Sequence, residues 1–282
     1  MKRKLLLFFL FLSSSFSIAS AAEIAREDSV IFRKFWKYAE EKSLLGIPID
    51  KRIPIIGEFF LGSPYVGGML NTGVPELPTI NLRKFDCVLF VEAVIAFALL
   101  DRYDDMAIET YVNNIIKLRY RNGELNYVSR LHYSSDWLYE MVRLKVLRDV
   151  THFCGGEVFP INVSFMTEHA KKYYPISHSK KVKADIKIVE EEINKRTYYY
   201  IPQDNLDTLS PKFRTGDVLL ITTNIKGLDT SHIGFAYKKK DKIYLMHASE
   251  TAKKVVISEL TLGEYIQGNK SQTGVMVGRI NR

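Results

Sequence analysis

The chain has 282 residues, of which 46% are hydrophobic and 26% are charged, so it can bury a core without help from disulfide bonds. It contains only two cysteines, which excludes a disulfide-rich scaffold. The formal net charge is +8, but no dense basic and aromatic groove signature is present, so we expect no nucleic-acid partner. A mild positive excess suits an anionic polymer of the cell envelope.

The first 22 residues have the pattern of a secretory signal peptide. A basic head precedes an apolar stretch from Leu5 to Leu12 and a small-residue tail that ends at Ala21 and Ala22. The apolar stretch is shorter than the about 20 residues that a membrane span requires, and no later segment reaches that length. We therefore expect cleavage near Ala21 or Ala22, export to the periplasm or the extracellular space, and no stable membrane insertion.

Residues 23–282 are predicted to form a single α+β domain, with helices first and an antiparallel sheet second. A first helix is predicted over residues 29–45, where apolar side chains recur at helical spacing. Residues 46–82 are rich in proline and glycine, which predicts a long irregular loop, and loops of this length are usually functional. Two further helices are predicted within a helical insertion that spans about 103–200, at 104–120 and 180–195.

From Thr215 onward, short apolar runs separated by turns predict strands. These runs cover residues 217–223, 232–237, 242–247, 254–257 and 273–280. The turn at 238–241 joins the second and third runs into a hairpin.

Cys87 stands directly before an apolar run, residues 88–100, that is interrupted only by Glu92 and predicts a buried helix. At the first turn of a helix, unpaired N–H groups and the positive end of the helix dipole favour a thiolate, which is a nucleophile. The alternative is a small buried core residue, because free cysteine is among the most buried residue types. A disulfide between Cys87 and Cys154 also stays open in an exported chain.

Two histidines lie on the predicted hairpin, His232 at the start of one strand and His247 at the end of the next. Antiparallel pairing brings them to the same end of the sheet, where neighbours across the ladder are about 5 Å apart. A thiol at a helix start, a histidine that takes its proton and a polar group that orients the imidazole are what a cysteine hydrolase needs. No histidine pair has the helical spacing of a hydrolytic zinc motif, so we expect neither a metal nor another cofactor.

The segment from Tyr127 to Trp137 mixes hydroxyls, rings, an arginine and a histidine without a clean period. Such a mixture is typical of a sugar or peptide site, and equally of a surface loop anchored by a buried aromatic residue. In the first interpretation, Tyr133 or Trp137 packs on a sugar, and Arg130 or Ser129 binds a carboxylate. Both interpretations stay open.

Five short motifs occur in one order with plausible spacing: Ser63–Gly68, Phe85–Cys87, Gly216–Val218, Ser231–Gly234 and Met246–Ala248. Together they resemble the successive motifs of the NlpC-type papain-like cell-wall hydrolases. Longer blocks are similar to the N-acetylmuramoyl-L-alanine amidase-like branch, and this similarity extends over nearly all of residues 23–282; the blocks are Asn81–Cys87, Tyr127–Arg130 and Gly227–His232. The common NlpC pattern continues with Ser-Gly after the cysteine, whereas Val88 and Leu89 follow here, so substrate preference does not transfer from the commoner endopeptidases.

The resemblance implies a papain-like α+β fold, in which an antiparallel sheet packs on helices and the nucleophile lies at a helix N-terminus, with extra N-terminal and inserted helices. It implies Cys87 as nucleophile, His232 as base and His247 as orienting residue. Tyr65 matches the family's tyrosine near the nucleophile and is expected to donate to the oxyanion or the substrate. The remaining expected substrate-binding groups flank the catalytic ones: Asp86 and Ser231.

The implied substrate is a peptidoglycan fragment, cut by a monomeric enzyme between the lactyl group of an N-acetylmuramic or anhydromuramic residue and L-alanine. Two alternatives stay open. A γ-D-glutamyl–diamino acid endopeptidase would keep the same catalytic groups and cut inside the stem peptide. A non-catalytic envelope protein would only bind muropeptide, with Cys87 paired to Cys154.

Overall fold

The computed structural model describes residues 24–70 and 76–281, and they form helices packed on an antiparallel sheet. The predicted signal peptide, residues 1–22, lies outside the described residues. The α-helices are α1 (Arg26–Glu41), α2 (Ile49–Phe59), α3 (Cys87–Ala98), α4 (Ala107–Arg119), α5 (Ser134–Arg143), α6 (Phe165–Glu168), α7 (Tyr174–His178), α8 (Lys180–Asn194), α9 (Leu206–Leu209) and α10 (Leu262–Gln267). No helix in the described ranges is both long and apolar enough to cross a membrane.

The strands are β1 (Leu147–Asp149), β2 (Glu157–Phe159), β3 (Tyr198–Pro202), β4 (Val218–Thr223), β5 (Thr230–Lys239), β6 (Lys242–Ser249), β7 (Lys254–Thr261) and β8 (Gln272–Ile280). They form one sheet in the order β2-β3-β8-β4-β5-β6-β7, with β1 paired to β8, and every pair is antiparallel. The five predicted strand runs correspond to β4–β8, and the predicted hairpin is β5–β6. The mixed α+β class with an antiparallel sheet is therefore confirmed.

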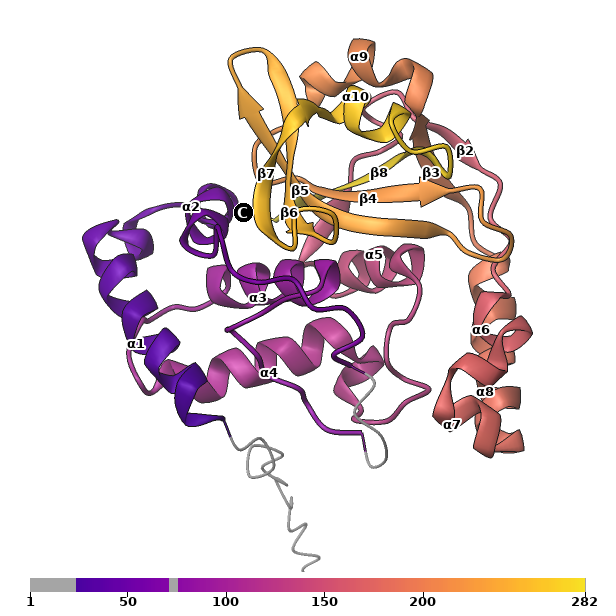
Figure 1. Ribbon diagram of the computed structural model, residues 1–282, viewed down its shortest axis with the longest axis horizontal. Coiled ribbons are helices and arrows are strands. Elements are labelled where there is room, and N and C mark those ends of the chain that lie inside the picture. The colour runs from indigo at the N-terminus through magenta and orange to yellow at the C-terminus, as the bar shows by residue number, and fades with distance from the viewer. Residues whose placement is uncertain (1–23, 71–75, 282) are drawn as a thin grey trace, which may run out of the picture.

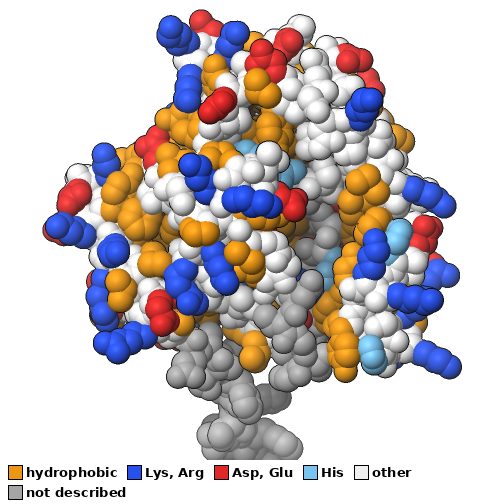
Figure 2. All heavy atoms as spheres, in the orientation of Figure 1, with side chains coloured by type: hydrophobic (Ala, Val, Ile, Leu, Met, Phe, Trp, Pro, Cys, Tyr) orange, Lys and Arg blue, Asp and Glu red, His pale blue; other side chains and the backbone are white. Residues whose placement is uncertain are grey.

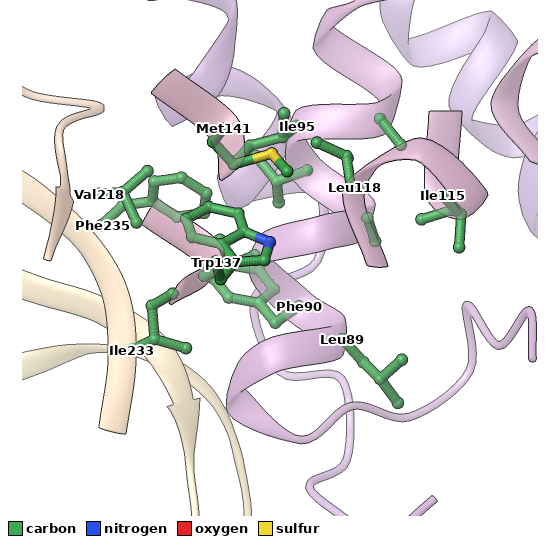
Figure 3. Close-up of a cluster of buried hydrophobic side chains, with 14 of the residues drawn as sticks. Leu89, Phe90, Ile95, Ile115, Leu118, Trp137, Met141, Val218, Ile233 and Phe235 are labelled. Carbon is green, nitrogen blue, oxygen red and sulfur yellow. The ribbon is translucent and has the colours of Figure 1, made fainter. Parts of the chain in front are cut away.

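Helix α3 packs across one face of the sheet, as Figure 1 shows. It is apolar on all sides, which is typical of a buried helix, and Phe90, Ile95 and Phe97 are fully buried. Figure 3 shows Phe90 beside Trp137 of α5, with Val218, Ile233 and Phe235 of the sheet nearby. Burial contributes about 1.5–3 kcal/mol for each such side chain. This core fixes the start of α3 relative to β5.

The other face of the sheet carries a second apolar cluster. Along β4, Val218 and Leu220 belong to the core under α3, whereas Leu219 and Ile221 belong to the second cluster, as the alternation of a strand requires. Helices α9 and α10 cover this second cluster (Figure 1). Both faces of the central strands are therefore buried, and the ends of the strands remain to carry a site.

The predicted loop over residues 46–82 is wrong in its first part, because α2 forms there and continues through Pro54. Tertiary packing outweighs the proline, since Ile53 and Ile56 are fully buried. A side chain at Gly57 would place its Cβ 2.4 Å from Met246 Cε of β6, so glycine allows this close approach.

The predicted helices over 29–45, 104–120 and 180–195 correspond to α1, α4 and α8. The predicted helical insertion, residues 103–200, contributes strands as well as helices, because β1 pairs with β8 and β2 pairs with β3. Strands of three residues are too short to leave a periodic signal in the sequence.

Candidate active site

Cys87 is the first residue of α3, and Asp86 caps that helix. The Leu89 N–H donates to Asp86 Oδ1 at 2.8 Å, which satisfies one of the unpaired N–H groups at the helix start. Helix α3 packs against β5, and the backbone N–H of Ile233, the residue after His232, acts to lower the pKa of the Cys87 thiol. The thiol is half-buried, so it lies against β5 and is still accessible. Asp86, expected to bind substrate, has one carboxylate oxygen committed to the helix cap.

The electrostatics of the thiol differ from the expectation drawn from its place at a helix start. Burial raises the pKa of Cys87 to about 12, and the negative charge of Asp86 adds to the rise. The N–H groups of Ile233, Val88 and Cys87 itself pull the pKa down, but they do not outweigh burial. The resting group is a thiol, and the prediction of a resting thiolate is wrong.

His232 and His247 contact each other at the end of the β5–β6 hairpin. His232 Nε2 lies 2.5 Å from His247 Nδ1, and the two rings are nearly perpendicular at 87°. Gly234 allows this approach, because a Cβ there would lie 2.9 Å from the Cβ of His247. If Nε2 of His232 carries the shared proton, its Nδ1 keeps a lone pair, which a general base requires.

Burial lowers the pKa of His232 to about 4. Burial, together with the charge of His232, lowers the pKa of His247 to about 3. Both imidazoles are therefore neutral at neutral pH. At neutral pH the thiol and both imidazoles therefore rest uncharged.

The start of β5 is anchored to α5 immediately before His232. Asp229 is 1% exposed, and its carboxylate accepts from the N–H groups of Ser135 and Thr230, each at 2.7 Å. The Thr230 hydroxyl donates to the Ser134 hydroxyl at 2.7 Å. These bonds tie the strand to a helix of the core and so hold the backbone that carries the histidine.

A β-bulge follows this anchor. Ile221 lies opposite His232 and Thr222 lies opposite Thr230, so Ser231 is an extra residue on β5. The Ser231 side chain is exposed at the bulge, beside the histidine, as a substrate-binding role requires.

Tyr65 lies beside the start of α3, held by backbone bonds on both sides. Its N–H donates to Lys253 O, and the Val66 N–H donates to Phe85 O, both at 2.9 Å. Burial raises the pKa of Tyr65 to about 12, and the charges of Cys87, Glu250 and Asp86 add to the rise. The phenol therefore keeps its proton and can donate it in a hydrogen bond.

The segment from Ser129 to Trp137 does not present its side chains as the substrate-binding interpretation expects, and fits the alternative of a loop anchored by buried aromatic residues. Tyr133 and Trp137 are 2% and 4% exposed, so neither ring offers a face to a sugar. The Tyr133 hydroxyl donates to Glu190 at 2.7 Å, and Trp137 packs in the core under the sheet (Figure 3). The hydroxyl of Ser129 is bonded to the carbonyls of Glu124 and Asn126.

Arg130 is also committed within the protein. It is 6% exposed, and its Nη1 donates to Glu76 Oε1 at 2.8 Å and to Leu70 O at 2.7 Å. These bonds favour a structural role for Arg130, and its predicted pairing with a substrate carboxylate lacks support.

The chain matches the family described as AmiA-like, N-acetylmuramoyl-L-alanine amidase-like, over residues 55–275. The chain belongs to this family. An N-acetylmuramoyl-L-alanine amidase from Bacteroides uniformis is similar to this AmiA-like chain, with 33% identity and a TM-score of 0.79 over 83% of this chain and 99% of that one.

Two other solved structures are similar to this AmiA-like chain. A putative xylanase from Bacteroides fragilis has 34% identity and a TM-score of 0.75, over 80% of this chain and 99% of that one. A protein from Legionella pneumophila has 21% identity and a TM-score of 0.69, over 91% of this chain and 95% of that one, which shows a shared fold alone. No curated protein sequence matches the chain significantly.

The two cysteines of this AmiA-like protein are free and lie apart. Cys87 packs beside the core under α3, whereas Cys154 is fully buried in the cluster on the other face of the sheet. A disulfide between them would require the sheet to open.

Sequence reasoning missed two residues near the site, Asp229 and Tyr265. Asp229 belongs to a block that resembles the family, but only the structure shows that its carboxylate anchors β5 to α5. Tyr265 lies on α10, whose capping box of Thr261 and Glu264 is readable in the sequence. Its contact with His247, at a ring-centroid distance of 5.2 Å, depends on how α10 crosses the sheet and leaves no local signal.

The face of the molecule drawn in Figure 2 carries no large patch of side chains of one charge. Figure 2 shows basic and acidic side chains scattered over one face, with histidine side chains reaching the surface near its centre. Among the described residues, no group of three or more His, Cys, Asp or Glu side chains is arranged to hold a metal ion.

Proposed function

We propose that the protein is an exported cysteine amidase that hydrolyses peptidoglycan fragments at the bond between N-acetylmuramic or anhydromuramic acid and L-alanine. The observation that carries the proposal is the pairing of two neutral imidazoles at 2.5 Å on β5 and β6, the strands that pack against the helix that begins at Cys87. Membership of the AmiA-like family supports the choice of an amide bond in peptidoglycan. We place this arrangement in the NlpC-type papain-like superfamily.

In the proposed acylation step, the Cys87 proton passes to His232 Nδ1 as the sulfur attacks the amide carbonyl. Because both groups start neutral, proton transfer and attack are coupled. His247 fixes the orientation of the His232 ring. It accepts a hydrogen bond from the Nε2–H of His232, which stabilises the imidazolium that forms. Backbone N–H groups at the start of α3 and the Tyr65 hydroxyl stabilise the oxyanion.

The imidazolium then gives its proton to the leaving amine, which departs as the peptide. A thioester of the muramoyl lactyl group remains on Cys87. His232 next takes a proton from water, and the hydroxide attacks the thioester carbonyl. The C–S bond breaks, the acid is freed, and the imidazolium returns its proton to the sulfur, which restores the thiol. In this order of steps, His232 is the group that accepts and returns each proton.

The chemistry of the site favours an amidase over a glycosidase. Glycoside hydrolysis uses two carboxyl groups that flank the bond, whereas this site presents a thiol and two imidazoles. The name putative xylanase, carried by a similar structure, therefore finds no support in these groups. A non-catalytic protein with a Cys87–Cys154 disulfide is also disfavoured, because both thiols are free and lie on opposite faces of the sheet.

The second candidate function is a γ-D-glutamyl endopeptidase, and the identity of the products distinguishes it from the amidase. The test is to digest N-acetylmuramoyl-L-Ala-γ-D-Glu-diaminopimelate and weigh the products. We expect free N-acetylmuramic acid and the intact tripeptide. Release of diaminopimelate with N-acetylmuramoyl-L-Ala-D-Glu would replace the amidase with the endopeptidase, and no cleavage at either bond would refute both.

Export rests on the basic and apolar pattern of residues 1–22. We expect the mature protein to begin near residue 22 or 23 and to act as a monomer in the periplasm or outside the cell. N-terminal sequencing of protein recovered from the periplasmic fraction tests this, and an intact Met1 on the active protein would contradict it.

A further inference from the structure

Tyr265 is held rigidly beside the catalytic histidines. Its ring meets the ring of His247 at a centroid distance of 5.2 Å and an angle of 81°, which is the edge-to-face geometry that aromatic pairs prefer. Helix α10 is fixed from below, because Leu262 and Ile266 are 1% and 0% exposed in the cluster under it.

The start of α10 is fixed as well. The side chain of Thr261 accepts from the Glu264 N–H, and the Glu264 carboxylate accepts from the Thr261 N–H at 2.8 Å. The Tyr265 ring therefore keeps its place whether or not its hydroxyl makes a bond.

The hydroxyl of Tyr265 is left over for another partner. The side chain is half-buried, and within residues 24–70 and 76–281 no hydrogen-bond partner of the hydroxyl is found. Burial raises the pKa of Tyr265, and negative charge on Cys87 would raise it further, so the phenol keeps its proton. The hydroxyl is not among the fully buried unpartnered atoms, so it reaches solvent and is open to a ligand.

Tyr65 and Tyr265 reach the site from different elements, Tyr65 beside the start of α3 and Tyr265 beside His247. Tyr65 comes from the segment between α2 and α3, and Tyr265 comes from α10, across the sheet end that carries the histidines. Burial raises the pKa of both phenols, so both keep their protons at neutral pH. Two phenol donors at one site can contact two different parts of a bound acyl compound.

We propose that Tyr265 is a substrate-binding residue whose hydroxyl donates to an acceptor oxygen of the muropeptide beside the scissile carbonyl, with the ring held in place by His247. This assignment rests on the proposed function for the identity of the ligand. It differs from the role of Tyr65, which stabilises charge that develops only during the reaction. Tyr265 acts already on the bound ground state.

The test separates binding from turnover by using Cys87→Ala, which retains the site and cannot form the thioester. The probe is N-acetylmuramoyl-L-Ala-D-isoglutamine, titrated by calorimetry into Cys87→Ala and into Cys87→Ala/Tyr265→Phe. Phenylalanine keeps the ring against His247 and removes only the hydroxyl. We expect the Kd to rise about 3–10-fold, the loss of one hydrogen bond to a neutral acceptor.

Tyr237→Phe in the same background is the matched control. Tyr237 lies on β5, and its hydroxyl donates to Glu58 of α2 at 2.7 Å. Removal of this hydroxyl should therefore leave the Kd unchanged. Tyr65→Phe should lower kcat in the active enzyme by more than it raises the Kd, because its bond strengthens in the transition state.

An unchanged Kd for the Tyr265→Phe variant would overturn the assignment, and so would an equal rise for Tyr237→Phe. Failure of the proposed function has a different signature, in which the wild type binds the probe and does not cleave it while the Tyr265 hydroxyl still matters. If Cys87→Ala does not bind the probe at all, the ligand class is wrong and the assignment falls with it.

Discussion

Two regions of this protein contain the same kinds of side chain and use them in opposite ways. The catalytic end of the sheet and the segment from Ser129 to Trp137 both combine hydroxyls or rings with a titratable group. In the segment, Arg130 and Tyr133 are 6% and 2% exposed, and each is bonded to a carboxylate of the protein. At the sheet end, Cys87 and His232 are half-buried, and His232 is bonded to another imidazole instead of a carboxylate.

The two regions differ in whether their polar side chains are already hydrogen-bonded within the protein. A buried polar group must find its partners in the fold itself. Arg130 and Glu76 neutralise one another inside the protein. Cys87 and His232 instead both rest uncharged, since burial raises the pKa of the thiol to about 12 and lowers the pKa of the imidazole to about 4. Residue type alone does not distinguish a functional site from a structural loop. The exposure of the side chains and their hydrogen-bond partners within the protein do.

Of the changes that test this difference between the two regions, replacing the Cys87 thiol should have the largest effect on activity. We expect Cys87→Ala to lower kcat/KM on muropeptides by at least about 10³-fold, because a nucleophile and its base act as a unit. Cys154→Ala is the control, since that thiol is buried on the other face of the sheet and should be dispensable for turnover in the folded enzyme. The measurement is kcat/KM for both variants, and turnover by Cys87→Ala near the wild-type rate would remove the thiol from the mechanism.

Replacing Arg130 should produce the opposite result. We expect Arg130→Ala to lower the free energy of unfolding by about 3 kcal/mol, because it leaves Glu76 buried without its partner. The folded fraction should keep its kcat/KM. Arg102→Ala is the control, since its pair with Asp104 is 47% exposed on both sides and should matter by less than about 1 kcal/mol. Urea unfolding with activity assays decides it, and a stable Arg130→Ala with weak substrate binding would return this residue to the site.

Replacing His247 should have an intermediate effect on activity. We expect His247→Ala to lower kcat by about 10²-fold with little change in KM, because His232 remains and loses only its orientation and the partner of its Nε2–H. His247→Asn keeps an acceptor and should recover part of the loss. Stopped assays on all three proteins give kcat and KM, and an unchanged kcat for His247→Ala would mean that another group orients the base.

The smallest effect we expect is a shift of the pH dependence. A base must be unprotonated to act, and the pKa of His232 is lowered to about 4 by burial, so kcat/KM should fall only below about pH 5. Labelling of Cys87 by iodoacetamide should be slow at pH 6 and should rise with pH above neutrality, because burial and Asp86 raise the pKa of the thiol. An acid limb near 6.5, or fast labelling at pH 6, would instead show a thiolate–imidazolium pair.

Much of the fold could be predicted from periodicity. The strands β4–β8, the hairpin β5–β6 and the helix that begins at Cys87 are long and regular, so their patterns are clear in the sequence. Helix α2 was missed because Pro54 disfavours a helix locally, and only the burial of its neighbours against the sheet offsets that cost. Strands β1 and β2 are too short to show a period.

The site could be predicted in part. A thiol before an apolar helix and two histidines on one hairpin indicate catalysis through chemistry and order alone. Tyr133 and Trp137 could not be assigned from sequence, because whether a ring lies in a core or on a surface is decided by long-range packing. Tyr265 was missed for the same reason, since α10 crosses the sheet end from the far end of the chain.

The central claim, acyl transfer through Cys87, is tested most directly by trapping the thioester. Hydroxylamine attacks the thioester carbonyl, forms a hydroxamate of the acyl group and releases the Cys87 thiol. When the wild type turns over N-acetylmuramoyl-L-Ala-D-isoglutamine in hydroxylamine, mass spectrometry should find N-acetylmuramoyl hydroxamate in addition to the free acid, and L-Ala-D-isoglutamine should be released at an undiminished rate. Release of the dipeptide with free N-acetylmuramic acid and no hydroxamate would mean that water attacks the amide directly, and would contradict the account.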